Sequence, residues 1–170
     1  LVEGRPRRLS AFLYVLCHSR ALYVEFTLCE QLEVFLACHE RAFAATGGVP
    51  RRVLYDNLRS VVLAHVGADV RLNPRFLDFS AHYGFKPVAC APYRPNEKGR
   101  VENAAKYLKQ SFLAGRSFPT LADANAAVHT WLEQVANVRD GIKHEFLELR
   151  ALLNQPGQGL HDGFVLVVSH

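Results

Sequence analysis

Two carboxylates stand at positions where a side chain could do chemistry. Asp56 directly follows the short strand predicted at residues 52–55, and the carboxyl end of a central strand faces the crevice of an α/β sheet. Glu102 lies one turn into a predicted helix, next to the apolar Val101. Carboxylates held by a sheet edge and by an adjoining helix can converge on divalent cations, which prefer oxygen ligands. Asp56 and Glu102 are therefore candidate metal ligands.

Each of these acids also has a simpler interpretation. Asp56 and the Asn57 that follows it are typical of a turn at the end of a strand. Glu102 can pair with Lys98 or Lys106, each four residues away on the same helix. Such a helical ion pair contributes only about 0.2–0.5 kcal/mol. Spacing alone leaves both interpretations open.

The basic residues are unevenly distributed along the chain. The 170 residues carry 20 basic and 16 acidic side chains, a net charge of +4. Residues 94–116 contain six basic and two acidic side chains, which accounts for the whole surplus. A local positive surplus indicates an anionic partner, and the alternative is a solvated helix face. The candidate contacts to such a partner are Arg94, Lys98, Arg100, Lys106 and Lys109.

Other motifs point to no further chemistry. The spacing of Cys29, Cys38 and His39 is not that of a zinc site. The sequence has no phosphate-binding loop, dinucleotide fingerprint or nucleophile elbow. Four cysteines are too few for a disulfide scaffold, which favours reduced thiols in a cytosol. Cys17 and Cys90 lie in predicted strands and are expected to be buried.

Hydrophobic periodicity predicts the elements that must position these residues. Residues 9–17 and 21–28 predict a β-hairpin. Residues 31–46 have the period of a helix, which Gly47-Gly48 ends. Residues 52–55 predict a short strand. A second helix is expected to begin at Asn73-Pro74 and to end at Gly84, and residues 86–91 predict another strand.

Two more helices follow. The first runs from residue 96 or 97 to about 113, after a loop bracketed by two prolines. Its apolar stripe consists of Val101, Ala104, Ala105, Leu108 and Phe112. The second begins with a Thr120 and Asp123 capping arrangement, and Trp131 belongs to its apolar face. Strands that alternate with helices after an opening hairpin predict an α/β domain with a mixed sheet.

Composition excludes several classes of protein. A chain that is 49% hydrophobic and 21% charged is not disordered, collagen-like or a coiled coil. The longest apolar runs, at residues 11–17 and 164–168, are much shorter than the roughly 20 residues of a bilayer span. We therefore expect no membrane segment. The absence of methionine and the first residue, Leu1, indicate a piece of a longer protein.

Four motifs together carry a family resemblance. They are Tyr55-Asp56-Asn57, Asn73-Pro74-Arg75-Phe76, His82-Tyr83-Gly84-Phe85, and the run from Pro92 to Glu102. From roughly residue 9 to residue 139, the chain resembles the retroviral-integrase-like core of bacterial insertion-sequence transposases of the IstA kind. The Lys98-Gly99-Arg100-Val101-Glu102 run is the most specific, because that family places its last catalytic glutamate there.

The resemblance implies a ribonuclease-H-like fold with a DDE triad of carboxylates. In it, Asp56 would be the second aspartate and Glu102 the glutamate. Three carboxylates would hold two Mg²⁺ (or Mn²⁺) ions, roughly 3.5–4 Å apart, for cleavage and strand transfer of DNA. The implied partners are transposon-end and target DNA, further copies of the chain and an ATP-dependent helper protein. The implied location is the cytoplasm of a bacterium, on the nucleoid when DNA is bound.

The sequence departs from this family at both ends. The first aspartate of the triad belongs on a first strand, yet residues 1–55 contain no aspartate. We therefore expect that strand and its acid to lie upstream of Leu1, the sheet to have an unpaired edge, and this chain to be inactive alone. We divide the chain into an incomplete integrase-like core, residues 1–139, and a divergent tail, residues 140–170, with loose chain at 155–159 before a short apolar end.

Two other functions remain open at this point. A ribonuclease-H-like nuclease would hydrolyse nucleic acid without joining it. A truncated transposase remnant would bind DNA without catalysis, and the missing aspartate favours this alternative for the chain as given.

Overall fold

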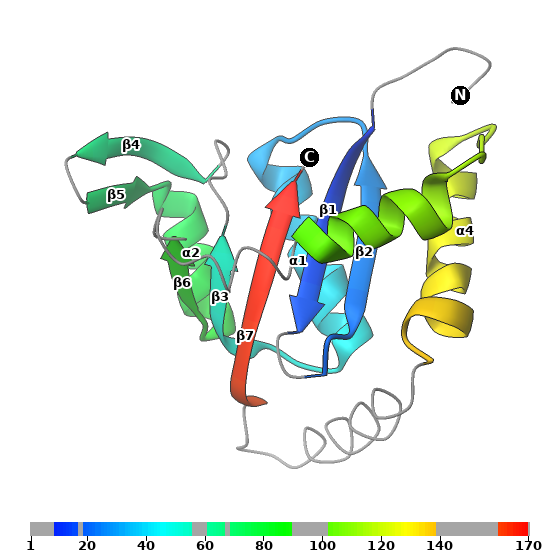
Figure 1. Ribbon diagram of the computed structural model, residues 1–170. Helices are drawn as coiled ribbons and strands as arrows, with labels where there is room; N and C mark the ends of the chain where they lie inside the picture. The colour runs from blue at the N-terminus through cyan, green and yellow to red at the C-terminus, as the bar shows by residue number, and fades with distance from the viewer. Residues whose placement is uncertain are drawn as a thin grey trace.

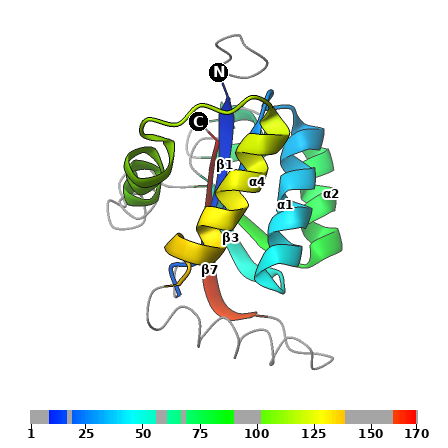
Figure 2. The same ribbon diagram turned by 90° about the vertical axis from the view of Figure 1, so that its right-hand side faces the viewer.

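The computed structural model describes residues 9–16, 19–55, 61–66, 69–89, 102–138 and 160–169. A five-stranded sheet forms the middle layer, with helices on both of its faces (Figures 1 and 2). This is the α/β architecture with a mixed sheet that the alternation of strands and helices predicts.

The sheet combines antiparallel and parallel pairs. Strands β1 (Ser10–Leu16) and β2 (Leu22–Thr27) form the predicted antiparallel hairpin. Strand β3 (Pro50–Tyr55) runs parallel to β6 (Lys86–Ala89). Strand β7 (Leu160–Ser169) lies between β1 and β3, antiparallel to the first and parallel to the second. The strand order is therefore β2-β1-β7-β3-β6 (Figure 1).

Two helices cover one face of the sheet. They are α1 (Leu32–Thr46) and α2 (Pro74–Tyr83). Phe12 and Tyr14 of β1 point into this layer, where they join a core that includes Phe35 and Phe76. Side chains alternate between the faces of a strand, so every second residue of β1 belongs to this core.

The opposite face is covered by the second pair of helices. Residues 102–107 are α-helical and continue into the π-helical turn η1 (Leu108–Leu113). The α4 helix (Leu121–Trp131) likewise continues into η2 (Leu132–Ala136). Leu13 and Val15 of β1 point into this second core, which contains Trp131 as predicted.

The helix ends follow the predicted signals. Gly47 and Gly84 adopt φ angles of 78° and 74°, the left-handed conformation that glycine adopts with little strain at a helix C-cap. The Asn73 side chain accepts a hydrogen bond from the backbone N–H of Arg75. Thr120 and Asp123 form the predicted capping box at the start of α4. Local sequence therefore fixes where these helices begin and end.

Two asparagines pair with the outer edge of β2. Asn125 accepts a hydrogen bond from the backbone N–H of Phe26 (2.7 Å) and donates one to the same residue's C=O (3.0 Å). Asn137 makes the same two bonds with Leu22, both at 2.9 Å. A carboxamide presents one acceptor and one donor side by side, as a neighbouring strand would. The pair thus satisfies an edge that would otherwise be free to bind another strand.

Replacing Asn125 with alanine is expected to lower the free energy of unfolding by about 1–3 kcal/mol. The change leaves a partly buried N–H and a C=O of Phe26 without partners, and that desolvation has a cost of this size. Denaturant titration measures the loss, with the exposed Gln134→Ala on η2 as a control. A loss no greater than that of the control would show that the pairing with Phe26 contributes nothing to stability.

Two features of the fold differ from the sequence expectation. A second hairpin, β4 (Val62–Val66) and β5 (Asp69–Leu72), was not predicted. The expectation that the loss of a first strand leaves an unpaired edge beside the hairpin is wrong for the described residues. There β7 pairs with both β1 and β3. β7 comes from the short apolar end of the chain, which was expected to follow loose chain at residues 155–159. The division of the chain at residue 139 stays a prediction.

Candidate functional site

The predicted site residues fall in two groups. Glu102 is the first described residue of the 102–113 helix, and its side chain is exposed. Lys106 and Lys109 lie on the same helix and are also exposed. Asp56 lies outside the described residues, as do Arg94, Lys98 and Arg100. Tyr55, the residue before Asp56, is the last described residue of β3.

The 102–113 helix is held firmly against the sheet. Its predicted stripe is confirmed at the four described positions, Ala104, Ala105, Leu108 and Phe112, all of which are buried. Phe112 stacks on Phe26 of β2 with ring centroids 6.2 Å apart, and its centroid lies 5.4 Å from that of Trp131. The buried stripe fixes the helix that carries Glu102 and the two lysines.

Tyr55, the last residue of β3, is anchored by a buried histidine. His39 of α1 has its Nδ1 atom 2.8 Å from the carbonyl oxygen of Phe35 and its Nε2 atom 3.0 Å from the hydroxyl oxygen of Tyr55. A carbonyl only accepts, so Nδ1 carries the hydrogen and donates it to Phe35. Nε2 therefore accepts a hydrogen bond from the Tyr55 hydroxyl.

Burial fixes the protonation states of this pair. The His39 side chain is fully buried, and desolvation lowers its pKa to about 4, so the imidazole is neutral near pH 7. Burial also raises the pKa of the Tyr55 hydroxyl well above its usual range, so this donor keeps its proton. The side chain of Tyr55, the last residue of β3, is consequently tied to α1 by a hydrogen bond that does not titrate near neutrality.

Sequence reasoning did not identify this anchor. The available signal was the spacing of Phe35, His39 and Phe43, which repeats every four residues on the buried face of a helix. The ring of His39 lies in a shell of aromatic side chains. The shell consists of Phe12, Phe35, Phe43, Tyr55, Phe76, Phe79 and Phe85.

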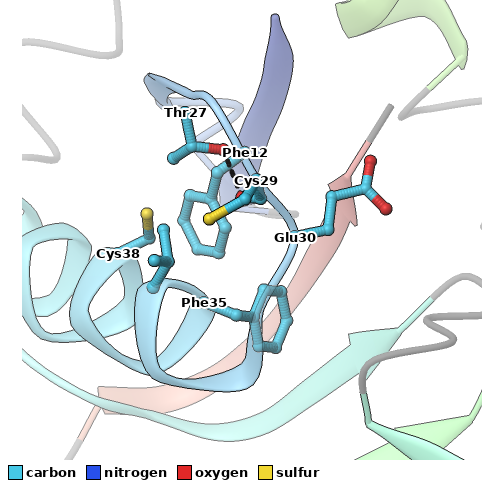
Figure 3. Close-up of a pocket in the computed structure, with 7 residues that line it drawn as sticks. Phe12, Thr27, Cys29, Glu30, Phe35 and Cys38 are labelled. Atoms are coloured by element: carbon cyan, nitrogen blue, oxygen red, sulfur yellow. Dashed lines mark hydrogen bonds between the residues drawn. The ribbon is translucent and has the colours of Figure 1, made fainter.

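A small pocket beside α1 has no evident role in this site. Figure 3 shows it lined by side chains that include Phe12, Cys29 and Cys38, with the Glu30 carboxylate directed away from the thiols. Burial, with a smaller effect of a nearby acid, raises the pKa of the Cys38 thiol to about 12. Both ring nitrogens of His39 are already hydrogen-bonded, to Phe35 and to Tyr55.

The proposed metal ligands have suitable chemistry, because carboxylate oxygens are the ligands that Mg²⁺ prefers. Within the part of the chain that the structure describes, no three His, Cys, Asp or Glu side chains are grouped closely enough to hold a metal ion. Asp56 lies outside that part. No described helix is long and apolar enough to cross a membrane.

Comparison with known proteins finds similarity both to a family model and to individual proteins. The model of the integrase core domain matches residues 2–95. The chain is 39% identical, over 82% of its length, to each of two transposases: that of insertion sequence element IS21 from Pseudomonas aeruginosa and that of IS640 from Shigella sonnei. It is 32% identical, over 79% of its length, to the transposase of an IS21-like element from Bacteroides fragilis.

The chain spans less than half the length of each of these relatives. It covers 36% of the Pseudomonas protein, 44% of the Shigella protein and 26% of the Bacteroides protein. The similarity therefore concerns one portion of each relative.

Proposed function

This chain belongs to the integrase core domain family, and from that membership we propose that it is catalytic-core sequence of a DNA transposase. The activity is metal-dependent cleavage of DNA strands followed by strand transfer. The observation that carries the proposal is the similarity to three insertion-sequence transposases over about four fifths of the chain. No feature of the described residues favours a nuclease that only hydrolyses.

We assign Asp56 and Glu102 as the carboxylates that hold Mg²⁺ or Mn²⁺. Divalent ions, when bound, activate the attacking oxygen and stabilise the leaving oxygen of the scissile phosphate. Leu54 of β3 packs in the same core as the 102–113 helix, and Asp56 lies two residues after it. Strand residues two apart share a face, so an Asp56 that continued the course of β3 would face the helix that bears Glu102. Tyr55, anchored to His39, holds the strand end before Asp56.

The basic residues are proposed to contact DNA phosphates. Lys106 and Lys109 are both exposed; Lys106 lies four residues after Glu102, and Lys109 lies three residues after Lys106. Residues three and four apart are neighbours on a helix surface, so a phosphate bound by these lysines would lie beside Glu102. Arg94, Lys98 and Arg100 are proposed to extend the same contact along the chain. Such contacts hold the DNA backbone without reading its sequence.

Replacing both Lys106 and Lys109 with alanine should weaken DNA binding and flatten its dependence on salt. Each lost phosphate contact lowers the slope of log K against log salt by about 0.9, so a decrease of about 2 is expected. Fluorescence anisotropy with a labelled duplex, at several salt concentrations, measures this slope. Lys86→Ala is the matched control, because Lys86 is exposed and lies where β6 begins, at the other end from Asp56. An unchanged slope in the double variant would remove the phosphate role.

The activity itself is tested by a strand-transfer assay. A labelled duplex with a free 3′-hydroxyl is incubated with a plasmid, Mg²⁺ and a form of the protein extended upstream of Leu1. Joined product is expected, whereas hydrolysis without joining would indicate a nuclease. The 170-residue chain alone is expected to be inactive, because its residues 1–55 contain no aspartate that could serve as the first acid of the proposed triad.

Three further properties belong to the same proposal. The active assembly is expected to contain several copies of the protein and to bind transposon-end and target DNA. An ATP-dependent helper protein is an expected partner. The cytoplasm, with association to the nucleoid through DNA, is the proposed location.

A further inference from the structure

Strand β7 occupies an unusual position for a segment near the end of the chain. It lies in the middle of the sheet, with β1 on one side and β3 on the other (Figure 1). Leu166 pairs with Val15 of β1 in the antiparallel ladder and with Leu54 of β3 in the parallel one. No ladder joins β1 directly to β3 among the described strands, so β7 alone connects the two halves of the sheet.

Each half of the sheet has its own pairing and its own helices. On one side, β1 and β2 form a local hairpin, α1 packs on both strands, and α4 contacts β2. On the other side, β3 pairs with β6, which α2 contacts. The two helices α1 and α2 also contact each other. All of these contacts are made by residues before 139. Between β1 and β3 they leave a gap in the sheet that is one strand wide.

The chain reaches this position from far away in sequence. Leu166 is about 150 residues from Val15 and 112 from Leu54. Twenty-one residues, 139–159, separate the end of the described helical region from the first residue of β7. β7 is therefore not placed by a short connection to a neighbouring strand, and the described contacts that hold it are its ladders with β1 and β3.

β7 also brings no acid to the end of the sheet where Asp56 follows β3. Its one acidic residue, Asp162, precedes Phe164, which pairs with Arg52. Tyr55, next to Asp56, pairs with Val167. Asp162 and Val167 are five residues apart, about 16 Å along a strand. At that end of the sheet β7 therefore contributes main-chain pairing and no carboxylate.

We infer that the facing edges of β1 and β3 form a strand-binding site, and that its occupant is this chain's own segment, residues 160–169. The site recognises an extended segment by main-chain hydrogen bonds on both sides, a two-sided form of strand addition to a sheet. The covalent link through residues 139–159 is not needed for binding. This inference concerns the 170-residue chain and does not rest on the activity proposed above.

The test begins with the full chain and then cuts the link. A protease recognition sequence is inserted after residue 150, and the purified protein is cleaved under native conditions. We expect the fragment that contains residues 160–169 to co-elute with the larger piece in size-exclusion chromatography. Separation of the two pieces, whether or not the larger one stays folded, would overturn the inference.

Exchange with a synthetic peptide tests recognition without altering the folded protein. A fluorescent peptide of residues 160–169, with lysines added for solubility, should replace the cleaved fragment in a 1:1 complex. A Leu166→Pro peptide should bind more than about tenfold more weakly, because proline removes a ladder hydrogen bond from a central strand. A Leu160→Pro peptide is the matched control, since the first residue of a strand tolerates proline. Equal binding of the Leu166→Pro and unmodified peptides would contradict main-chain recognition.

Discussion

Asp56→Asn and Glu102→Gln are each expected to abolish DNA cleavage in the protein extended upstream of Leu1. Either change keeps the size of the side chain and removes the charge that would hold the metal ions. Carboxylates that share a metal pair act as a unit, so one replacement should lower the rate by at least about 10³-fold. DNA binding should stay within about twofold, since the phosphate contacts lie on other residues. Cleavage of a labelled duplex and anisotropy measure the two quantities.

Matched controls separate a lost ligand from a lost charge. Asp78→Asn on α2 and Glu133→Gln on η2 make the same chemical changes at exposed positions. Both controls should cleave DNA at the unmodified rate. If Asp56→Asn or Glu102→Gln cleaved as well as its control, the assignment of that residue would be wrong. If DNA binding failed together with cleavage, the result would indicate a disturbed structure, which circular dichroism would detect.

The second large effect concerns the pH dependence of stability. The pKa of His39 falls from an ordinary value of 6.5 to about 4 on folding, because burial disfavours the charged imidazole. The unfolded chain therefore binds a proton between these two values that the folded chain does not bind. The free energy of unfolding should decrease as the pH falls from about 6.5 to about 4, by about 3 kcal/mol from this group. Below pH 4 the contribution should level off.

His39→Phe isolates this contribution. The variant loses the hydrogen bond with Tyr55 and is expected to be less stable at pH 7. Its unfolding free energy should depend less on pH between 6.5 and 4 than that of the unmodified protein. His82→Phe on α2 is the control, because that imidazole is exposed. Urea titrations at a series of pH values give both slopes, and parallel slopes for the unmodified protein and His39→Phe would rule out a neutral buried histidine.

Local signals in the sequence predicted much of this fold. The hairpin of β1 and β2, the caps at Asn73 and Gly84, and the stripe from Ala104 to Phe112 all depend on residues close together in the chain. The ribonuclease-H-like class and the relation to insertion-sequence transposases are confirmed by the integrase core match and by the relatives. The roles of Asp56 and Glu102 stay predictions.

Long-range pairing explains what the sequence did not reveal. The apolar run at 164–168 was visible, but its ladder partners are more than a hundred residues away. The strands β4 and β5 are only five and four residues long, too short for a clear periodic signal. The hydrogen bond between His39 and Tyr55 depends on how α1 lies against β3. A separation of sixteen residues between a helix and a strand does not reveal this packing.

The register of β7 brings distant parts of the chain next to each other. Ser169, its last residue, pairs with Phe12 near the start of β1, so β7 ends beside the strand that opens the sheet (Figure 1). A circular permutant that joined residue 170 to residue 1 and opened the chain at residue 140 would make β7, β1 and β2 one antiparallel meander. In that order both ladders of the meander would be local, and only the parallel ladders of β3 with β7 and β6 would still join strands separated by other elements.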